Sequence, residues 1–236
     1  MKTIILNQKS YFNYDEMCKF KSEFEKFDYK NIDFIIFPPV LYLIMFKDVK
    51  YKVGVQNFFS YTKGSFTGEF NLESLKNIGV KYTLINHFER RKLMEESYNT
   101  QKEKLFKSLN SKCHTILCVG EAKKSSKPWS YVKKELGYML RSIESSNIEY
   151  ISIAYEPNWA VGSGDVQNVS KIESIINKIK KYMKNKYDVD VSVYYGGSIT
   201  SDNVADIIKI TDGIVLGKSS TNIEALKEIA SKVNDN

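Results

Sequence analysis

Polar side chains that could do chemistry stand directly after several short apolar runs of this 236-residue chain. A carboxylate can move a proton, an imidazole can polarise a carbonyl group, and an ammonium group can balance a developing negative charge. An enzyme that acts on a phosphorylated carbonyl compound needs this combination. The residues are Asn7 and Lys9 after the first run, His87 and Glu89 after the fourth, and Glu156 after the sixth.

Two turns rich in small residues complete the set. The sequence YGGSI at 195–199 follows the seventh run, and GKSS at 217–220 follows the eighth. Backbone N–H groups in such turns can bind phosphate. Both turns therefore favour a phosphorylated substrate.

The most specific stretch is AYEPNWAVGSGD at 154–165. Its proline restricts the preceding residue, Glu156, to extended geometry and so holds it at the end of its strand. Gly162 and Gly164 can act as hinges or let a phosphate approach, with Trp159 as an apolar cover. An ordinary strand-to-helix loop that begins with a proline would show the same pattern.

The chain has only two histidines, His87 and His114. A lone histidine beside an apolar run is more often a hydrogen-bonded structural residue than a catalyst. The polar companions of His87 at the strand ends favour a chemical role for it. His114 has no such companions, and we expect it to be structural.

The apolar runs alternate with segments whose apolar residues recur at helical spacing. Eight such units predict a single-domain (β/α)8 barrel over residues 1–236, with its chemistry at the carboxyl ends of the strands. A doubly wound open sheet is the alternative, because alternation alone does not show that the sheet closes. The expected strands are 3–7, 33–39, 52–57, 82–86, 115–121, 151–157, 191–197 and 213–217, and the expected helices are 14–27, 128–146, 169–186, 200–210 and 220–233.

The composition argues against several classes of protein. The net charge of +7 comes almost entirely from lysines interspersed with acidic residues, and the basic loop KKSSK at 123–127 has no aromatic residues that could stack on bases. We therefore expect no nucleic-acid partner. The chain has no run of 18 apolar residues, no apolar N-terminal core long enough for a signal peptide and no C-x-x-C pair among its three cysteines. These features predict a cytoplasmic protein without a membrane span.

Motifs for other chemistries are incomplete. GIVLGKSS has three residues between its glycines where a P-loop has four, and GSGDVQ lacks the third glycine of a dinucleotide fingerprint. The chain has no G-x-S-x-G elbow and no cluster with metal-ligand spacing. We therefore expect neither a cofactor nor a metal ion.

Taken in order, the motifs resemble those of the triosephosphate isomerase family. AYEPNWAVGSG is similar to the family's glutamate and flexible lid, and NHFERR is similar to its histidine motif. NQK, CVGE, YGGSI and DGIVLGKSS resemble the ends of its first, fifth, seventh and eighth strands. Residues 53–82 resemble its third loop and the helix after it, so the matches run from residue 3 to about residue 222.

The resemblance implies cofactor-free interconversion of D-glyceraldehyde 3-phosphate and dihydroxyacetone phosphate through an enediolate. Glu156 would be the base, and Lys9 and Asn7 would contact the substrate. His87 would polarise the carbonyl group as a neutral imidazole at a helix N-terminus, a tuning for which this family is the standard example. The segment FERRKLMEES would be that helix. Glu89 would form an ion pair or take part in a proton network.

The resemblance also assigns the phosphate site, the lid and a partner. Residues 158–164 would be the lid that excludes water from the intermediate. The family is typically a homodimer in which the third loop, here Gln56–Glu69, inserts beside the partner's active site. The matching loop residues are Gln56, Asn57, Thr67, Gly68 and Glu69, and the backbone amides expected at the phosphate are those around Gly162, Ser198, Gly217 and Lys218.

Four residues depart from the family pattern. Phe88 stands where a serine usually follows the histidine, and Asn86 where a glycine usually precedes it. Gln8 replaces a tryptophan, and Lys218 replaces the second glycine of the eighth strand end. Two alternatives therefore stay open: an isomerase of a related sugar phosphate such as a tetrulose phosphate, and a non-catalytic phosphate-binding barrel.

Overall fold

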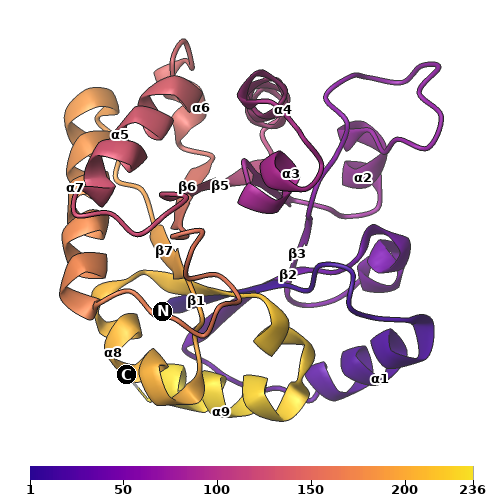
Figure 1. Ribbon diagram of the computed structural model, residues 1–236. Coiled ribbons are helices and arrows are strands. Elements are labelled where there is room, and N and C mark those ends of the chain that lie inside the picture. The colour runs from indigo at the N-terminus through magenta and orange to yellow at the C-terminus, as the bar shows by residue number, and fades with distance from the viewer. Residues whose placement is uncertain (236) are drawn as a thin grey trace.

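The computed structural model describes residues 1–235, which are built around a closed barrel of eight parallel strands (Figure 1). The strands pair in chain order, and β8 pairs back with β1. The predicted (β/α)8 barrel is therefore confirmed, and the open doubly wound sheet is excluded. The strands are β1 (Lys2–Asn7), β2 (Ile32–Phe37), β3 (Lys52–Val55), β4 (Tyr82–Ile85), β5 (His114–Val119), β6 (Ile151–Tyr155), β7 (Val193–Gly196) and β8 (Gly213–Leu216).

Helices surround the barrel on the outside (Figure 1). No helix within residues 1–235 combines the length and the apolar character needed to cross a membrane. The α-helices are α1 (Tyr14–Phe24), α2 (Leu72–Asn77), α3 (Phe88–Lys92), α4 (Tyr98–Asn110), α5 (Pro128–Met139), α6 (Ser145–Ile148), α7 (Val169–Tyr187), α8 (Ser201–Ile210) and α9 (Ile223–Asn234), and two 3-10 helices are η1 (Val40–Phe46) and η2 (Lys218–Thr221).

Helix α7 shows how the sequence sets the limits of such a helix. The Asn168 side chain accepts the N–H groups of Ser170 and Lys171, which have no partner inside the helix. Asp188 adopts the left-handed conformation and ends it. Between these residues an apolar stripe is buried against the barrel and the neighbouring helices, and it consists of Ile172, Ile175, Ile176, Ile179 and Met183.

Two helix predictions are wrong in extent. The helix expected over FERRKLMEES ends at Lys92, because Leu93 and Met94 stay exposed and Glu95 turns left-handed at φ 53°. Ser97 then caps α4, a further helix that is not among those predicted. The helix expected over 128–146 ends at Met139, close to a second left-handed residue, Ser142 at φ 71°.

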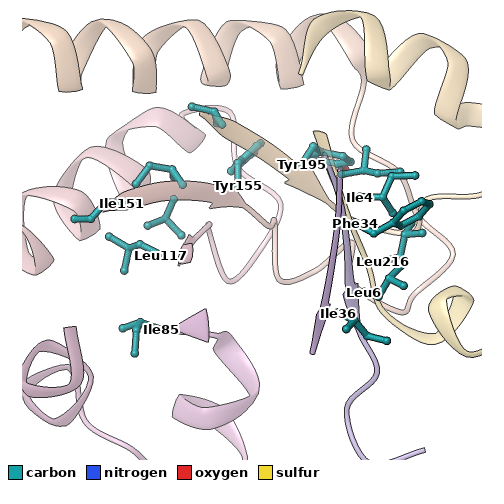
Figure 2. Close-up of a cluster of buried hydrophobic side chains, with 14 of the residues drawn as sticks. Ile4, Leu6, Phe34, Ile36, Ile85, Leu117, Ile151, Tyr155, Tyr195 and Leu216 are labelled. Carbon is teal, nitrogen blue, oxygen red and sulfur yellow. The ribbon is translucent and has the colours of Figure 1, made fainter. Parts of the chain in front are cut away.

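The buried side chains form two layers, one on each side of the strands. Because successive strand residues point to opposite faces, each strand supplies both layers. The outer layer lies between the strands and the helices. Figure 2 labels some of its side chains, among them Ile4, Leu117 and Tyr155. The inner layer fills the barrel and consists of Ile5, Ile35, Phe37, Leu84, Ile116, Cys118, Ala154, Tyr194 and Val215.

This alternation carries two of the predicted site residues into the barrel mouth. Asn7 follows the inner-layer Ile5 by two positions, and Glu156 follows Ala154 by two. Each is 4% exposed. Both side chains therefore share the face of the inner layer at the carboxyl end of the barrel, as the strand-end positions predicted.

The barrel closes where β1 meets β8. Thr3 lies opposite Gly213 in the register, and a Cβ atom on Gly213 would overlap the backbone carbonyl of Thr3. A backbone carbonyl within a paired strand cannot move aside without breaking the ladder. Gly213 is therefore the residue that lets the last strand approach the first.

We predict that Gly213→Ala lowers the free energy of unfolding by about 2 kcal/mol, because overpacking a filled interior forces the backbone apart. Gly137→Ala is the matched control. Gly137 lies within α5, and its added methyl group would meet only the Tyr182 hydroxyl at 3.6 Å. That variant should gain about 0.5–1 kcal/mol. Urea denaturation of both proteins measures the difference, and equal stabilities would contradict this account of closure.

Candidate active site

A cavity of about 500 Å³ opens at the carboxyl ends of the strands. All the residues predicted for catalysis and phosphate binding, apart from the proton-network candidate Glu89, line it. They come from the ends of β1, β4, β6, β7 and β8 and from the loop after β6. The predicted residues in the lining are Asn7, Lys9, His87, Glu156, Gly162, Ser198, Gly217 and Lys218.

His87 and Glu156 lie side by side across the cavity. The His87 Nε2 atom is 3.3 Å from the Glu156 Oε2 atom, and the two residues are 6% and 4% exposed. Gly196 makes this packing possible, because a Cβ atom there would lie 2.8 Å from the Glu156 Cγ atom. The other carboxylate oxygen of Glu156 faces the Cys118 thiol at 3.9 Å.

The backbone fixes which nitrogen of His87 carries the proton. His87 caps α3, and its Nδ1 atom accepts the Glu89 backbone N–H at 3.4 Å. An acceptor nitrogen carries no proton, so this bond fits a neutral ring with its N–H on Nε2, towards the cavity. Although α3 is shorter than expected, its free first-turn N–H group still provides this contact.

Lys9 is held by an ion pair with Glu89. The Lys9 ammonium lies 2.5 Å from the Glu89 Oε1 atom, and the Glu89 Oε2 atom is 3.7 Å from His87 Nδ1. Lys9 adopts the left-handed conformation at φ 51°, and its carbonyl accepts a hydrogen bond from the Gln56 side chain at 2.9 Å. Glu89 thus contacts Lys9 and His87, which line the cavity, but does not line the cavity itself.

The loop after β6, which is predicted to be the lid, is hydrogen-bonded to the turn after β7 at the rim of the cavity. The Ser198 hydroxyl donates to the Ala160 carbonyl at 2.6 Å and accepts the Gly164 N–H at 3.0 Å. Gly162 and Gly164 have φ angles of 71° and 83°, which explains why this loop needs glycine at both positions. The loop between β6 and α7 is thereby closed onto the turn after β7.

A buried carboxylate outside the predicted set, that of Glu121, holds a residue of the predicted lid. Glu121 accepts hydrogen bonds from the Trp159 indole N–H at 3.0 Å and from the Tyr155 hydroxyl at 3.2 Å. Burial raises the pKa of Glu121. Its position at the end of CVGE marked it as a strand-end residue, but only the tertiary structure reveals its contact with Trp159, 38 residues away.

Comparison with known proteins identifies the family. The family model described as "Triosephosphate isomerase" matches residues 2–233.

This chain belongs to the triosephosphate isomerase family.

Individual relatives agree with this assignment. The chain is 38% identical over 209 residues to the triosephosphate isomerase of Wigglesworthia glossinidia brevipalpis, with 82% of this chain and 80% of that protein covered. It is 31% identical over 243 residues to that of Orientia tsutsugamushi (strain Boryong), with 98% and 97% covered. It is 34% identical over 191 residues to that of Alkaliphilus metalliredigens (strain QYMF), with 77% of each covered. The motif-based prediction of an isomerase of this family is confirmed.

The departures from the family pattern differ in their structural setting. The amide nitrogen of Asn86 donates two hydrogen bonds in the interior, whereas neither amide atom of the buried Gln8 side chain has a partner among residues 1–235. Nothing in the structure explains Gln8. His114 stacks on Tyr82 at 5.0 Å at the start of β5, away from the cavity, as expected for a structural histidine. Among the described residues, no group of three or more His, Cys, Asp or Glu side chains could hold a metal ion.

Phe88 lies directly beside the predicted catalytic pair. Its ring is half-buried at the first position of α3, with its centroid 5.1 Å from that of His87. A phenylalanine offers the Glu156 carboxylate no hydrogen bond. The imidazole, by contrast, is held by the Glu89 N–H group independently of this ring.

We predict that Phe88→Ser leaves kcat unchanged or raises it, because His87 keeps its backbone hydrogen bond and the site gains a hydroxyl donor. Phe27→Ser, which removes another half-buried phenylalanine, located just after α1 and outside the cavity lining, is the control for general effects of the substitution. Steady-state kinetics in both directions measure the outcome. A large fall in kcat for Phe88→Ser would show that the phenylalanine is part of a re-tuned site.

Proposed function

We propose that this chain interconverts D-glyceraldehyde 3-phosphate and dihydroxyacetone phosphate, and that Glu156, His87, Lys9 and Asn7 carry the reaction. The observation that supports this most directly is the 3.3 Å approach of His87 Nε2 to the Glu156 carboxylate in a cavity mouth that also holds Lys9. A base and an electrophile on adjacent substrate atoms need this spacing.

Glu156 acts as the base. Its carboxylate removes a proton from the carbon next to the carbonyl group, the electrons of that C–H bond form the carbon–carbon double bond, and the carbonyl oxygen takes the negative charge. The protonated Glu156 then returns the proton to the neighbouring carbon. The hydroxyl proton moves between the two oxygens, so the product is an isomer and no other reactant is consumed.

His87 and Lys9 stabilise the charge on the oxygen. The Nε2–H of His87 donates to the oxygen that becomes the oxyanion, and the Lys9 ammonium places a positive charge near it. Triosephosphate isomerase is itself the standard example of a neutral histidine in this role. Asn7 contacts the substrate at the end of β1. Glu89 positions Lys9 through their ion pair.

The phosphate group binds at the far end of the cavity. Backbone N–H groups around Gly162, Ser198, Gly217 and Lys218 receive it, and binding energy from this remote group contributes to the proton-transfer step. The closed lid excludes water, which limits elimination of phosphate from the intermediate. Gly217 lies close to Lys9, since a Cβ atom there would be 3.8 Å from the Lys9 Nζ atom.

We predict that Glu156→Gln lowers kcat for glyceraldehyde 3-phosphate by about 10²–10⁴-fold, because an amide of the same size cannot accept the proton. A coupled assay measures turnover, and parallel assays with tetrulose phosphates test the substrate range. Glu173→Gln, at an exposed position on α7, is the control. A wild-type preference for tetrulose phosphates would overturn the substrate assignment. Tight binding of an enediolate mimic without turnover would instead indicate a non-catalytic barrel.

The chain also carries the surface expected of a homodimer. The loop between β3 and α2, which contains Gln56–Glu69, projects away from the barrel (Figure 1). Three aromatic rings of this loop pack on one another: the ring centroid of Phe66 lies 4.8 Å from that of Phe59 and 5.3 Å from that of Tyr61. The Tyr61 side chain is nevertheless 55% exposed. Thr67, Gly68 and Glu69 are exposed as well. We infer that a second copy of the chain covers this loop.

We expect the protein to sediment at twice the mass of one chain, and Phe66→Asp to shift it to the monomer, because a buried unpaired charge opposes association. Tyr131→Asp is the control, since Tyr131 is an exposed aromatic residue on α5, outside this loop. Analytical ultracentrifugation at several protein concentrations measures both. A wild-type protein that stays monomeric at micromolar concentration would contradict the dimer.

We further infer that residues 1–236 form one domain that works in the cytoplasm. All eight strands belong to the same barrel, and Cys18, Cys113 and Cys118 are free thiols. Free thiols suit a reducing compartment.

A further inference from the structure

Asn86, immediately before His87, has a left-handed backbone conformation, and its side-chain amide nitrogen donates two hydrogen bonds. It is completely buried with φ 66°, in the left-handed region where glycine is the residue of lowest strain. Its side-chain Nδ2 group donates to the Cys118 carbonyl at 2.8 Å and to the Glu135 Oε1 atom at 2.9 Å. Its backbone N–H donates to the Gln101 Oε1 atom at 2.6 Å.

Glu135 forms hydrogen bonds to several elements that surround His87. This carboxylate, on α5, is 8% exposed and receives four donors. Its Oε1 atom accepts from Asn86, from the Arg91 guanidinium at 2.9 Å and from the Tyr98 hydroxyl at 3.1 Å. Its Oε2 atom accepts the Gly120 N–H at 2.9 Å. One buried side chain thus joins the end of β4, helices α3 and α4, and the end of β5.

These contacts fix the chain both before and after His87, because Glu135 binds Asn86 on one side and Arg91 on the other. Asn86 precedes the imidazole, and Arg91 belongs to the helix that His87 caps. Gly120 in turn packs directly against the backbone carbonyl of Glu156, so the same carboxylate also lies close to the end of β6. A charged acceptor with several donors forms stronger hydrogen bonds than a neutral one, which makes the arrangement rigid.

We propose that Asn86 and Glu135 are positioning residues for His87. The pair fixes the approach of the imidazole Nε2–H to the substrate oxygen, although neither residue lines the cavity. In this chain the left-handed position before the histidine is occupied by a residue whose side chain is bonded to Glu135, and glycine would lack that link. The proposal rests on the proposed role of His87 as the electrophile.

Two variants test the pair. Asn86→Gly keeps the backbone conformation without strain and removes both side-chain hydrogen bonds. Glu135→Gln keeps the shape but has a single acceptor oxygen, so it cannot accept from both Asn86 and Gly120. We expect each variant to lower kcat about tenfold, since small displacements of a reacting group are costly, while KM changes less than about twofold. Tyr98→Phe, which removes one donor only, should give a smaller fall and is the variant to use if the others do not fold.

A second readout does not depend on turnover. Because the chain has only two histidines, ¹⁵N-histidine NMR shows one set of ring signals for His87 and one for His114. In the wild type the His87 signals should report an Nε2–H tautomer with an acceptor Nδ1. In Asn86→Gly and Glu135→Gln they should shift or broaden towards a mixture of tautomers, while the His114 signals stay unchanged.

Thr115→Val is the control for loss of stability alone. Thr115 is buried on β5 and bonded to the Ser108 hydroxyl at 2.8 Å, and it does not line the cavity. This variant should be less stable but keep the wild-type kcat and His87 signals. If the Asn86 and Glu135 variants behave like Thr115→Val, the network is purely structural and the proposal is wrong. If the wild type lacks turnover, the proposed function fails while the His87 spectra still decide whether the network positions the ring.

Discussion

Closure of the barrel between β1 and β8 is the constraint on which the rest of the structure depends. Gly213 allows this approach because it has no Cβ atom to meet the Thr3 carbonyl. Once the ring of parallel strands is complete, their carboxyl ends share one rim, and residues from five strand ends line one cavity. The distance between His87 and Glu156, 69 positions apart in the chain, is a consequence of that closure.

The end of β5 supports the site from behind although it supplies no residue to the cavity lining. Two consecutive residues there connect to different parts of the site. The Gly120 N–H donates to Glu135, which also holds Asn86, and the Glu121 carboxylate receives the Trp159 indole of the lid. The segment that carries His87 and the loop that carries Trp159 are therefore both attached to the end of β5. Buried, multiply bonded carboxylates suit this task because each holds several donors in fixed directions.

The sequence was sufficient to predict the type of fold and most of the cavity lining. The eight apolar runs correspond to the eight strands, with ends displaced by a few residues, and the polar residues just after them line the cavity. The helix limits were less well predicted after His87 and after Met139. In both places left-handed residues, Glu95 and Ser142, interrupt segments whose side-chain pattern alone suggested a longer helix.

Local sequence determined which residues stand at the strand ends, because strand periodicity and the Glu156–Pro157 pair are properties of neighbouring residues. Tertiary structure alone decided which of them meet and what supports them. Glu135 is one of 28 acidic residues in the chain, and no short-range pattern distinguishes it from the others. It became the centre of the His87 support only because barrel closure and helix packing brought Asn86, Arg91, Tyr98 and Gly120 around it. Contacts between residues distant in the chain depend on the whole packed fold. Motifs and spacing describe only neighbouring residues, so they could not predict these contacts.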